Sequence, residues 1–440
     1  MSIATLDRIP TAIAALPSAP DTHTALRFIT CGSVDDGKST LIGRLLVDSR
    51  AVLQDQLASV QRSGQADLAL LTDGLQAERE QGITIDVAYR YFSTAARKFV
   101  IADAPGHEQY TRNMVTAASS ADAAVVLVDA TKLQWQDALP ALLAQTRRHA
   151  LLVKLLRVSS IVFAINKLDA VDDPGLAFDH IRAALLRFAE EAGLNAHAIV
   201  PVSALIGYNV VDAMPGWCGY TGPCLLQILE QLPATPPDSG LAFSLSVQWV
   251  EKFSSSSDTV QGRRIFWGRV ASGVLRVGQR IAVMPGGRCA TVAEVLSATR
   301  QPGSVTAGTS AGLILDRELD ISRGDWLLAD EAEGDETGQK NINATLAWLD
   351  DEAAVAGRTY WALHGHRWVK ARIKRIVNQL DIQSLQTHEA HTLAANAIGE
   401  VELSFQEPLA VLPFSQARVR GSLVLIDAAT HRTAGAVLVA

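Results

Sequence analysis

Eight consecutive residues near the N-terminus have the types and spacing of a phosphate-binding loop. They read G-x-x-x-x-G-K-S, from Gly32 to Ser39. Glycines permit a tight turn, and the backbone N–H groups of such a turn bind phosphate oxygens where the turn leads into a helix. Lys38 is placed to reach the outer phosphates, and the Ser39 hydroxyl to hold Mg2+. We therefore predict a nucleotide site that includes Gly32, Ser33, Val34, Asp35, Asp36, Gly37, Lys38, Ser39 and Thr40.

A second motif, D-x-x-G, consists of Asp103, Ala104, Pro105 and Gly106 and follows an apolar run. An aspartate there can hold Mg2+ through a water, and the Gly106 N–H can bond the terminal phosphate, so the loop senses whether that phosphate is present. His107 follows and is predicted to position the attacking water, in preference to a surface or packing role. Thr84 lies between the two motifs and is predicted to give Mg2+ a second hydroxyl; the alternative is a plain β-branched strand.

Two later motifs carry groups that recognise guanine. Asn166, Lys167, Leu168 and Asp169 form N-K-x-D, and Ser203, Ala204 and Leu205 follow the next apolar run. A carboxylate accepts hydrogen bonds from both the N1–H and the exocyclic amine of guanine, whereas adenine has no matching pair of donors. We assign base recognition to Asp169, with the Lys167 stem along the base and a backbone N–H of residues 203–205 at the guanine carbonyl. N-K-x-D also occurs by chance on surface turns, but here it follows the other motifs in order.

These motifs must meet at one edge of a sheet, and residues 25–232 have the pattern of such a scaffold. Apolar runs alternate with helical patterns and lie at 26–31, 98–102, 123–128, 160–165 and 198–202. Near-continuous apolar strands joined by helices indicate a parallel sheet covered on both faces, which binds ligands at the carboxyl ends of its strands. Four of the five runs end in the phosphate loop, Asp103, Asn166 or Ser203. We expect an α/β P-loop domain of the GTPase type.

The chain changes character after a proline-rich stretch, Leu232 to Gly240. Short alternating segments broken by glycines indicate a small β-barrel, and the acidic stretch from Asp330 to Gln339 separates it from a second one. The predicted organisation is a mobile tail at 1–24, a GTP-binding domain at 25–232, a linker at 233–240, a first barrel at 241–330, a linker at 331–343 and a second barrel at 344–440.

Composition limits the classes of function. The 440 residues are 48% hydrophobic and 19% charged, ordinary for a globular protein, and carry a formal net charge of −7. That charge argues against naked nucleic acid as the main partner, and Arg147, Arg148 and His149 are predicted to form a solvated helix face. The four cysteines suit neither a zinc site nor a disulfide framework, which favours a reduced, cytoplasmic compartment. No apolar stretch is long enough to predict a membrane span.

Together the motifs resemble those of translational-type GTPases, the class of elongation factor Tu, in which a GTP-binding domain precedes two β-barrels. Several segments resemble one branch closely, the GTPase subunit (subunit 1) of bacterial sulfate adenylyltransferases: 77–92, 103–114, 273–280, 320–325 and 421–427. Gln81 stands where translation factors usually have arginine. The resemblance covers the chain from about residue 25 to its end.

The resemblance implies that the chain binds GTP and GDP with Mg2+ and couples GTP hydrolysis to the formation of adenylyl sulfate and pyrophosphate from ATP and sulfate, the first step of sulfate assimilation. It places adenylyl transfer in a separate ATP-pyrophosphatase-type partner, subunit 2, in a heterodimer or higher assembly. No second phosphate loop follows, so the adenylylsulfate kinase fused to some relatives is not expected.

Two segments depart from the family pattern. The segment 132–145 is longer than the family pattern leads us to expect, and the segment 251–264 contains a run of serines. We expect the longer segment to lie on the flank of the GTP-binding domain, away from the nucleotide motifs. How this segment affects the contact with a partner stays open on the sequence.

Two other functions stay open on the sequence. A translation factor of this class would deliver a charged tRNA, but the acidic balance and Gln81 argue against it. A regulatory GTPase without a coupled reaction is compatible with three domains and a phosphate-sensing loop. Co-purification distinguishes the three by its result: an ATP-pyrophosphatase-type partner, a tRNA, or neither.

Overall fold

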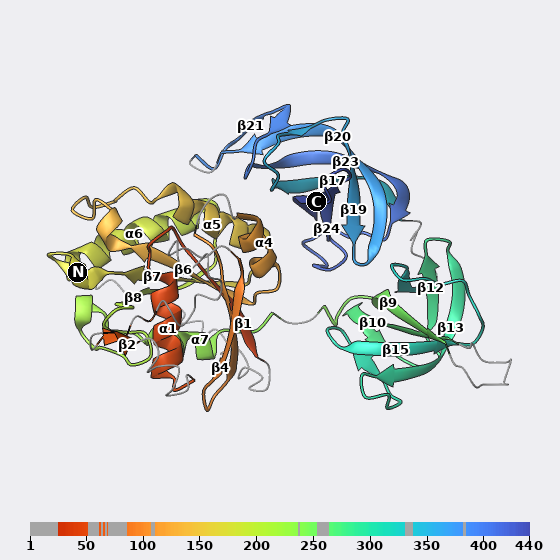
Figure 1. Cartoon of the computed structure of the whole chain (residues 1–440), viewed down its shortest axis with the longest axis horizontal. Coiled ribbons are helices and arrows are strands. Elements are labelled where there is room, and N and C mark those ends of the chain that lie inside the picture. The colour runs from red at the N-terminus through yellow and green to blue at the C-terminus, as the bar shows by residue number, and fades with distance from the viewer. Residues whose placement is uncertain are drawn as a thin grey trace, which may run out of the picture.

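The chain folds into an α/β domain followed by two β-barrels (Figure 1). The computed structural model describes residues 25–51, 61–62, 65–66, 68, 86–106, 111–235, 238–252, 264–330, 338–381 and 384–440. The predicted N-terminal tail, Thr84, His107 and most of the serine-containing segment lie outside these residues.

The α/β domain is built on a six-stranded sheet in the order β4-β5-β1-β6-β7-β8. Its parallel strands are β1 (Leu26–Cys31), β5 (Lys98–Asp103), β6 (Ala123–Asp129), β7 (Ser160–Asn166) and β8 (Ala196–Pro201). All five coincide with the apolar runs of the sequence. β6 and β7 are buried at every residue because helices cover both faces of the sheet.

The edge strand β4 (Ala88–Ser93) was not predicted, and it makes the sheet mixed rather than purely parallel. It pairs antiparallel with β5. Only Phe92 is buried along it, and Tyr91 is 70% exposed, so no continuous apolar run marks this strand in the sequence.

Helices form two layers on the sheet. One apolar cluster joins the sheet to α4 (Thr111–Ser119), α5 (Ala144–Leu155) and α6 (Pro174–Ala192), and another joins it to α1 (Lys38–Asp48) and α7 (Leu225–Gln231). Single 3-10 turns lie at η3 (Ala130–Lys132), η4 (Leu168–Ala170) and η5 (Trp217–Gly219). None of the helices in the described ranges combines the length and apolarity needed to cross a bilayer.

The first barrel closes in the order β10-β15-β13-β12-β16-β9. Its strands are β9 (Ser244–Lys252), β10 (Arg264–Ser272), β12 (Arg280–Met284), β13 (Arg288–Ser297), β15 (Ser310–Leu315) and β16 (Trp326–Ala329). Two short strands within the same stretch of chain, β11 (Val274–Leu275) and β14 (Val305–Thr306), pair with each other as a separate two-stranded sheet. In the α/β domain β2 (Gln61–Arg62) pairs with β3 (Gln65–Ala66).

The second barrel runs β19-β24-β25-β17-β23-β20 and closes by pairing β19 with β20. Its strands are β17 (Gln339–Trp348), β19 (Thr359–His364), β20 (Arg367–Leu380), β23 (Ile398–Leu409), β24 (Ser422–Asp427) and β25 (Thr433–Val439). β21 (Thr387–Glu389) extends the end of β20, and β18 (Ala354–Val355) pairs with β22 (Thr392–Leu393). At the junction with the first barrel, His364 stacks on Trp326 and Arg367 pairs with Asp325 at 2.9 Å.

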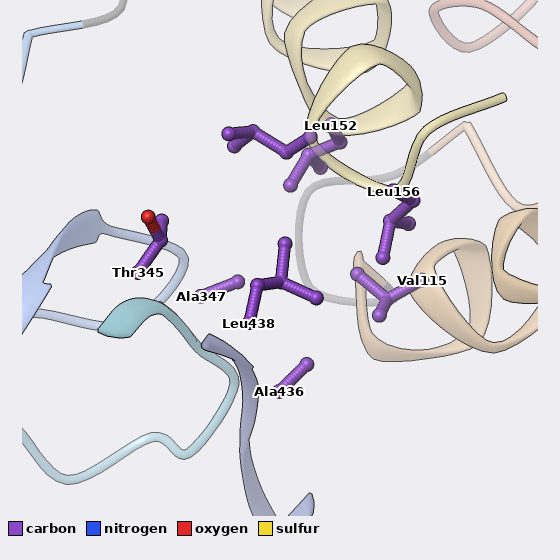
Figure 2. Close-up of a pocket in the computed structure, with 8 residues that line it drawn as sticks. Val115, Leu152, Leu156, Thr345, Ala347, Ala436 and Leu438 are labelled. Atoms are coloured by element: carbon purple, nitrogen blue, oxygen red, sulfur yellow. The ribbon is translucent and has the colours of Figure 1, made fainter. Parts of the chain in front are cut away.

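An apolar seam joins the α/β domain to the second barrel. Figure 2 shows Val115, Leu152 and Leu156 from α4 and the α5 end facing Leu438 and its neighbours on β17 and β25. At its edge, the Arg418 guanidinium donates to the carbonyls of Ser119 (3.3 Å) and Leu156 (3.0 Å). Leu349 and Ile398 of the second barrel belong to the same buried cluster as Val115 and Leu152, so the seam is continuous with the core of the α/β domain.

A charge placed in this seam is expected to separate the two domains. Leu438→Asp would put a carboxylate against Leu152 and Leu156, where burial without a partner is unfavourable. Small-angle X-ray scattering should then report a larger radius of gyration than for wild type. The control is Val355→Asp, because Val355 is already 40% exposed on the same barrel. An unchanged profile for Leu438→Asp would contradict the role of the seam.

Candidate functional site

The predicted nucleotide motifs meet at the carboxyl edge of the sheet, where one buried amide joins them. Asn166, the last residue of β7, donates from Nδ2 to the Asp36 carbonyl (2.8 Å). Its Oδ1 accepts the Ala204 N–H (3.0 Å). The amide therefore ties the phosphate loop after β1 to the segment after β8, which brings the predicted phosphate and base regions to one place.

Backbone carbonyls of the phosphate loop itself hold the side chain of its lysine, Lys38, in place. Lys38 begins α1, and its Nζ donates to the carbonyls of Gly32 (3.2 Å) and Ser33 (2.7 Å). The Asp36 carboxylate accepts the Ser33 N–H at 2.6 Å. Gly37 has φ 92°, and a Cβ there would lie 2.5 Å from the Asn166 amide nitrogen, so only glycine fits. The backbone N–H groups at the start of α1 thus border a loop with a fixed ammonium.

Two buried carboxylates, those of Asp103 and Asp36, lie near this ammonium. Burial lowers the pKa of Lys38, while the carboxylates of Asp103 and Asp36 act in the opposite direction. Burial likewise raises the pKa of Asp36, against the effect of Lys132. Asp103 is 2% exposed and accepts a hydrogen bond from the Thr30 hydroxyl (3.3 Å). The site therefore presents one cation between carboxylates, an arrangement suited to oxygen-liganded cations and phosphates together.

The segment 132–145 touches the nucleotide motifs at both ends, contrary to the prediction. Lys132 Nζ lies 2.9 Å from Asp36 Oδ1 and also bonds the Val34 carbonyl. Gln145 Nε2 donates to the Gly106 carbonyl at 3.3 Å. The reason is topological: the segment leaves β6 at the same sheet edge as the phosphate loop and returns to it at the start of α5.

His149 is a second correction, because it is buried and not part of a solvated face. Its Nδ1 accepts the Gly32 N–H at 3.1 Å, and it is 0% exposed. Burial, with Lys38 and Arg148 nearby, lowers the pKa of His149 to about 3, so the imidazole is neutral. Arg147 instead lies over the Phe188 ring. The buried positions Thr146, His149 and Val153 have helical spacing, which is the signal that could have identified it.

Asp129 was also missed, although it directly follows the third apolar run, 123–128. It is 1% exposed and forms an ion pair with Lys167 at 2.8 Å. Its other oxygen accepts the Thr131 N–H at 2.9 Å and so caps η3. Lys167 has φ 61° and donates to the Asp35 carbonyl at 2.5 Å. Asp129 therefore fixes the lysine of N-K-x-D against the phosphate loop.

The base-recognition residues lie at the rim of this edge. Asp169 is exposed in η4, next to the buried Leu168. Ser203 donates its N–H to the Tyr208 carbonyl (3.1 Å), and Ala204 gives its N–H to Asn166. Leu205 is 70% exposed, and its N–H has no hydrogen bond to another described residue. Of the three N–H groups predicted for the guanine carbonyl, that of Leu205 is the one not already used.

The remaining predicted residues divide into two groups. Ala104 and Gly106 are buried beside the phosphate loop, and the Ala104 N–H donates to the Thr30 carbonyl at 3.2 Å. A Cβ on Gly106 would collide with Lys38 Nζ, which places D-x-x-G directly against the loop. Thr84 and His107 lie in 69–85 and 107–110, outside the described residues, so their roles stay predictions.

The buried His149 should make stability depend on pH. The folded state keeps the imidazole neutral down to about pH 3, whereas the unfolded chain binds a proton near pH 6.5. The unfolded state thus holds more protons between these values, so the free energy of unfolding falls as pH falls through that window, by up to about 1.4 kcal/mol per pH unit.

The glutamine in His149→Gln can still accept the Gly32 N–H but does not titrate. The free energy of unfolding of this variant should therefore depend less steeply on pH in this window, by the equivalent of about one proton. Urea unfolding across pH 4–7 measures it, with the exposed His197→Gln as control. Equal slopes for wild type and His149→Gln would contradict the neutral, buried imidazole.

Two parts of the chain match family models: residues 23–235 match the elongation factor Tu GTP binding domain, and 341–440 match the GTP-eEF1A C-terminal domain-like family. The "Sulfate adenylyltransferase subunit 1" of Laribacter hongkongensis is 41% identical over 94% of this chain and 85% of the relative. That of Vibrio cholerae is 43% identical over 94% of this chain and 86% of the relative. The "Bifunctional enzyme CysN/CysC" of Xylella fastidiosa is 44% identical over 93% of this chain and 65% of the relative. The chain belongs to the family of sulfate adenylyltransferase subunit 1.

Proposed function

We propose that the chain is the GTP-hydrolysing subunit of a sulfate adenylyltransferase, and that a partner catalytic subunit, subunit 2, forms adenylyl sulfate and pyrophosphate from ATP and sulfate. The observation that carries the proposal is the Asn166 amide, which joins a phosphate loop to the rim where Asp169 is exposed. Family membership supplies the reaction to which GTP hydrolysis is coupled.

The phosphate end of GTP lies against the loop from Gly32 to Thr40. The N–H groups at the start of α1 and Lys38 Nζ bind phosphate oxygens. Mg2+ fits beside them, because hydroxyl and carboxylate oxygens are the ligands it prefers and Asp103 is buried next to Lys38. Ser39, Thr84 and Asp103 would hold it. When bound, the ion offsets negative charge on the phosphates.

The guanine lies at the rim formed by η4 and residues 203–205. Asp169 accepts from N1–H and the exocyclic amine, the Lys167 stem lies along the base, and the Leu205 N–H donates to the guanine carbonyl. Asp129 and Asp35 hold Lys167 in that position. Discrimination against adenine follows from donor and acceptor geometry.

The terminal phosphate is sensed at Gly106, and His107 positions the water that attacks it. α4 begins at Thr111, five residues after Gly106 in the sequence, and contacts the second barrel through Val115 and Ser119. A change at Gly106 on hydrolysis therefore reaches the seam over a short path. The barrels then move against the partner, which couples hydrolysis to sulfate activation.

The test of this function is reconstitution. The chain is mixed with subunit 2, ATP, sulfate and GTP, and adenylyl sulfate and GDP are followed together. Coupling predicts that both appear together and that a non-hydrolysable GTP analogue does not support sulfate activation beyond the unassisted equilibrium. Undiminished sulfate activation with the analogue would show that hydrolysis does not drive the reaction.

Asp169→Asn should change which base is bound. The xanthine carbonyl at position 2 needs a donor where guanine needed an acceptor, so the variant should lose GTP affinity and gain affinity for xanthosine triphosphate. Equilibrium binding of both nucleotides measures this. Asp172→Asn is the control, because Asp172 is an exposed carboxylate in the same loop. If Asp169→Asn hydrolyses GTP as well as wild type does, Asp169 is not the base-recognising residue.

His107→Ala should bind GTP normally but lose hydrolysis, because His107 makes no ground-state phosphate contact in this mechanism. Loss of one water-positioning side chain lowers the rate by about a hundredfold or more. Single-turnover hydrolysis and nucleotide affinity are measured on the same preparation, with the exposed His197→Ala as control. A parallel loss of affinity and rate would instead mean that His107 contacts the bound nucleotide.

A further inference from the structure

The outer surface of β19 and β20 in the second barrel combines an exposed tryptophan, Trp368, and a half-buried one, Trp361, with cations. Trp361 lies opposite Lys370, and Leu363 opposite Trp368, so each pair shares a face. Along β20 the alternate residues Val369, Ala371 and Ile373 are buried inside the barrel. We call the outward residues the tryptophan–lysine face: Trp361, Leu363, Trp368, Lys370, Arg372 and Lys374.

This face is apolar at one end and basic at the other. Trp368 is 52% exposed, and Lys370 Nζ lies 5.8 Å from the centre of the Trp361 ring. Lys374 approaches Glu402 at 3.7 Å, but no carboxylate of the described residues is within ion-pair distance of Lys370 or Arg372. The face is therefore locally basic, although the chain as a whole carries a formal net charge of −7.

The rest of the described chain leaves this face uncovered. In the barrel order β19-β24-β25-β17-β23-β20, the strands β17 and β25 that form the seam lie across the barrel from β19 and β20. The first barrel contacts the β19–β20 turn and the strand residues beside it, through His364, His366 and Arg367, and it also packs on Ala410 after β23. The tryptophan–lysine face therefore starts at the junction of the two barrels and lies across the second barrel from the strands that form the seam.

We propose that the tryptophan–lysine face docks the partner subunit, through an acidic patch on that partner surrounding an apolar side chain. The inference rests on the proposed function, which supplies the partner. Protein interfaces are enriched in tryptophan and arginine, and a few buried aromatic residues carry much of the binding energy. Cations at the rim steer an acidic partner and speed association.

A protein occupant is favoured over a nucleic acid. Glu402 bonds Arg375 at 2.6 Å and Glu400 bonds Asn378 at 2.7 Å, so carboxylates continue the same surface along β20 and β23. A phosphate backbone would be repelled by them, and a nucleic-acid site needs cations along its whole track. A compact docking patch needs only the cluster around Trp368, Lys370 and Arg372.

The test measures the dissociation constant of the full chain and purified subunit 2 by titration calorimetry at low and at moderate salt. Trp368→Ala removes the aromatic anchor, and the double variant Lys370→Glu/Arg372→Glu reverses the rim charge. Each should weaken binding by about tenfold or more, and the double variant should also lose most of the salt dependence. The GTP hydrolysis rate of the isolated variants should equal that of wild type, because the face is distant from the nucleotide.

Lys340→Glu is the matched control, because Lys340 is exposed on β17 of the same barrel and its reversal should leave the dissociation constant unchanged. Wild-type affinity in both face variants would overturn the proposal while leaving the proposed function intact. Equal weakening by Lys340→Glu would overturn it too, since any charge reversal would then act alike.

Failure of the wild-type chain to bind subunit 2 at all would instead count against the proposed function and remove the proposed occupant. A single-stranded RNA oligonucleotide serves as a further probe. Binding of that RNA by wild type and its loss in the face variants would assign the face to nucleic acid and overturn the protein assignment.

Discussion

The Asn166 amide is the interaction on which the site depends. It is 2% exposed, and both ends of the amide are used, one by the Asp36 carbonyl and one by the Ala204 N–H. A buried amide that loses one partner leaves the other group unsatisfied, which costs more than the bond itself contributes. The end of β7 therefore fixes the distance between the phosphate loop and the base rim, and the absence of a Cβ on Gly37 lets the amide come close enough.

A second constraint is the burial of charge around Lys38. The ammonium is 6% exposed between the carboxylates of Asp36 and Asp103, while Lys132 and Lys167 neutralise Asp36 and Asp129 from the rim. Buried charges persist when each has an opposite partner. Since the lysines belong to η3 and N-K-x-D, elements far away in sequence hold the phosphate loop in place. The neutral His149 imidazole accepts the Gly32 N–H and so stabilises the loop without adding charge.

Most of the sheet and the nucleotide motifs could be predicted because the sequence signal is local. β6 and β7 are apolar at nearly every position, and G-x-x-x-x-G-K-S has one main structural meaning. β4 was not predicted because Tyr89 and Tyr91, on its outward face, are exposed, so the strand has no continuous apolar run. His149 was misjudged because two arginines precede it, and Lys132 because a contact between positions 132 and 36 leaves no trace in sequence spacing. Thr84 and His107 stay sequence-based assignments.

α4 lies between the D-x-x-G motif and the seam. The helix starts five residues after Gly106, and its Val115 and Ser119 touch the second barrel. The two barrels pack on each other through His364, Trp326 and the Asp325–Arg367 pair. In the proposed mechanism, a shift of α4 reaches the second barrel through these contacts and the first barrel through the junction between the two barrels. If hydrolysis shifts the barrels in this way, linkage requires that a partner that holds the barrels also alters how the α/β domain binds its nucleotide.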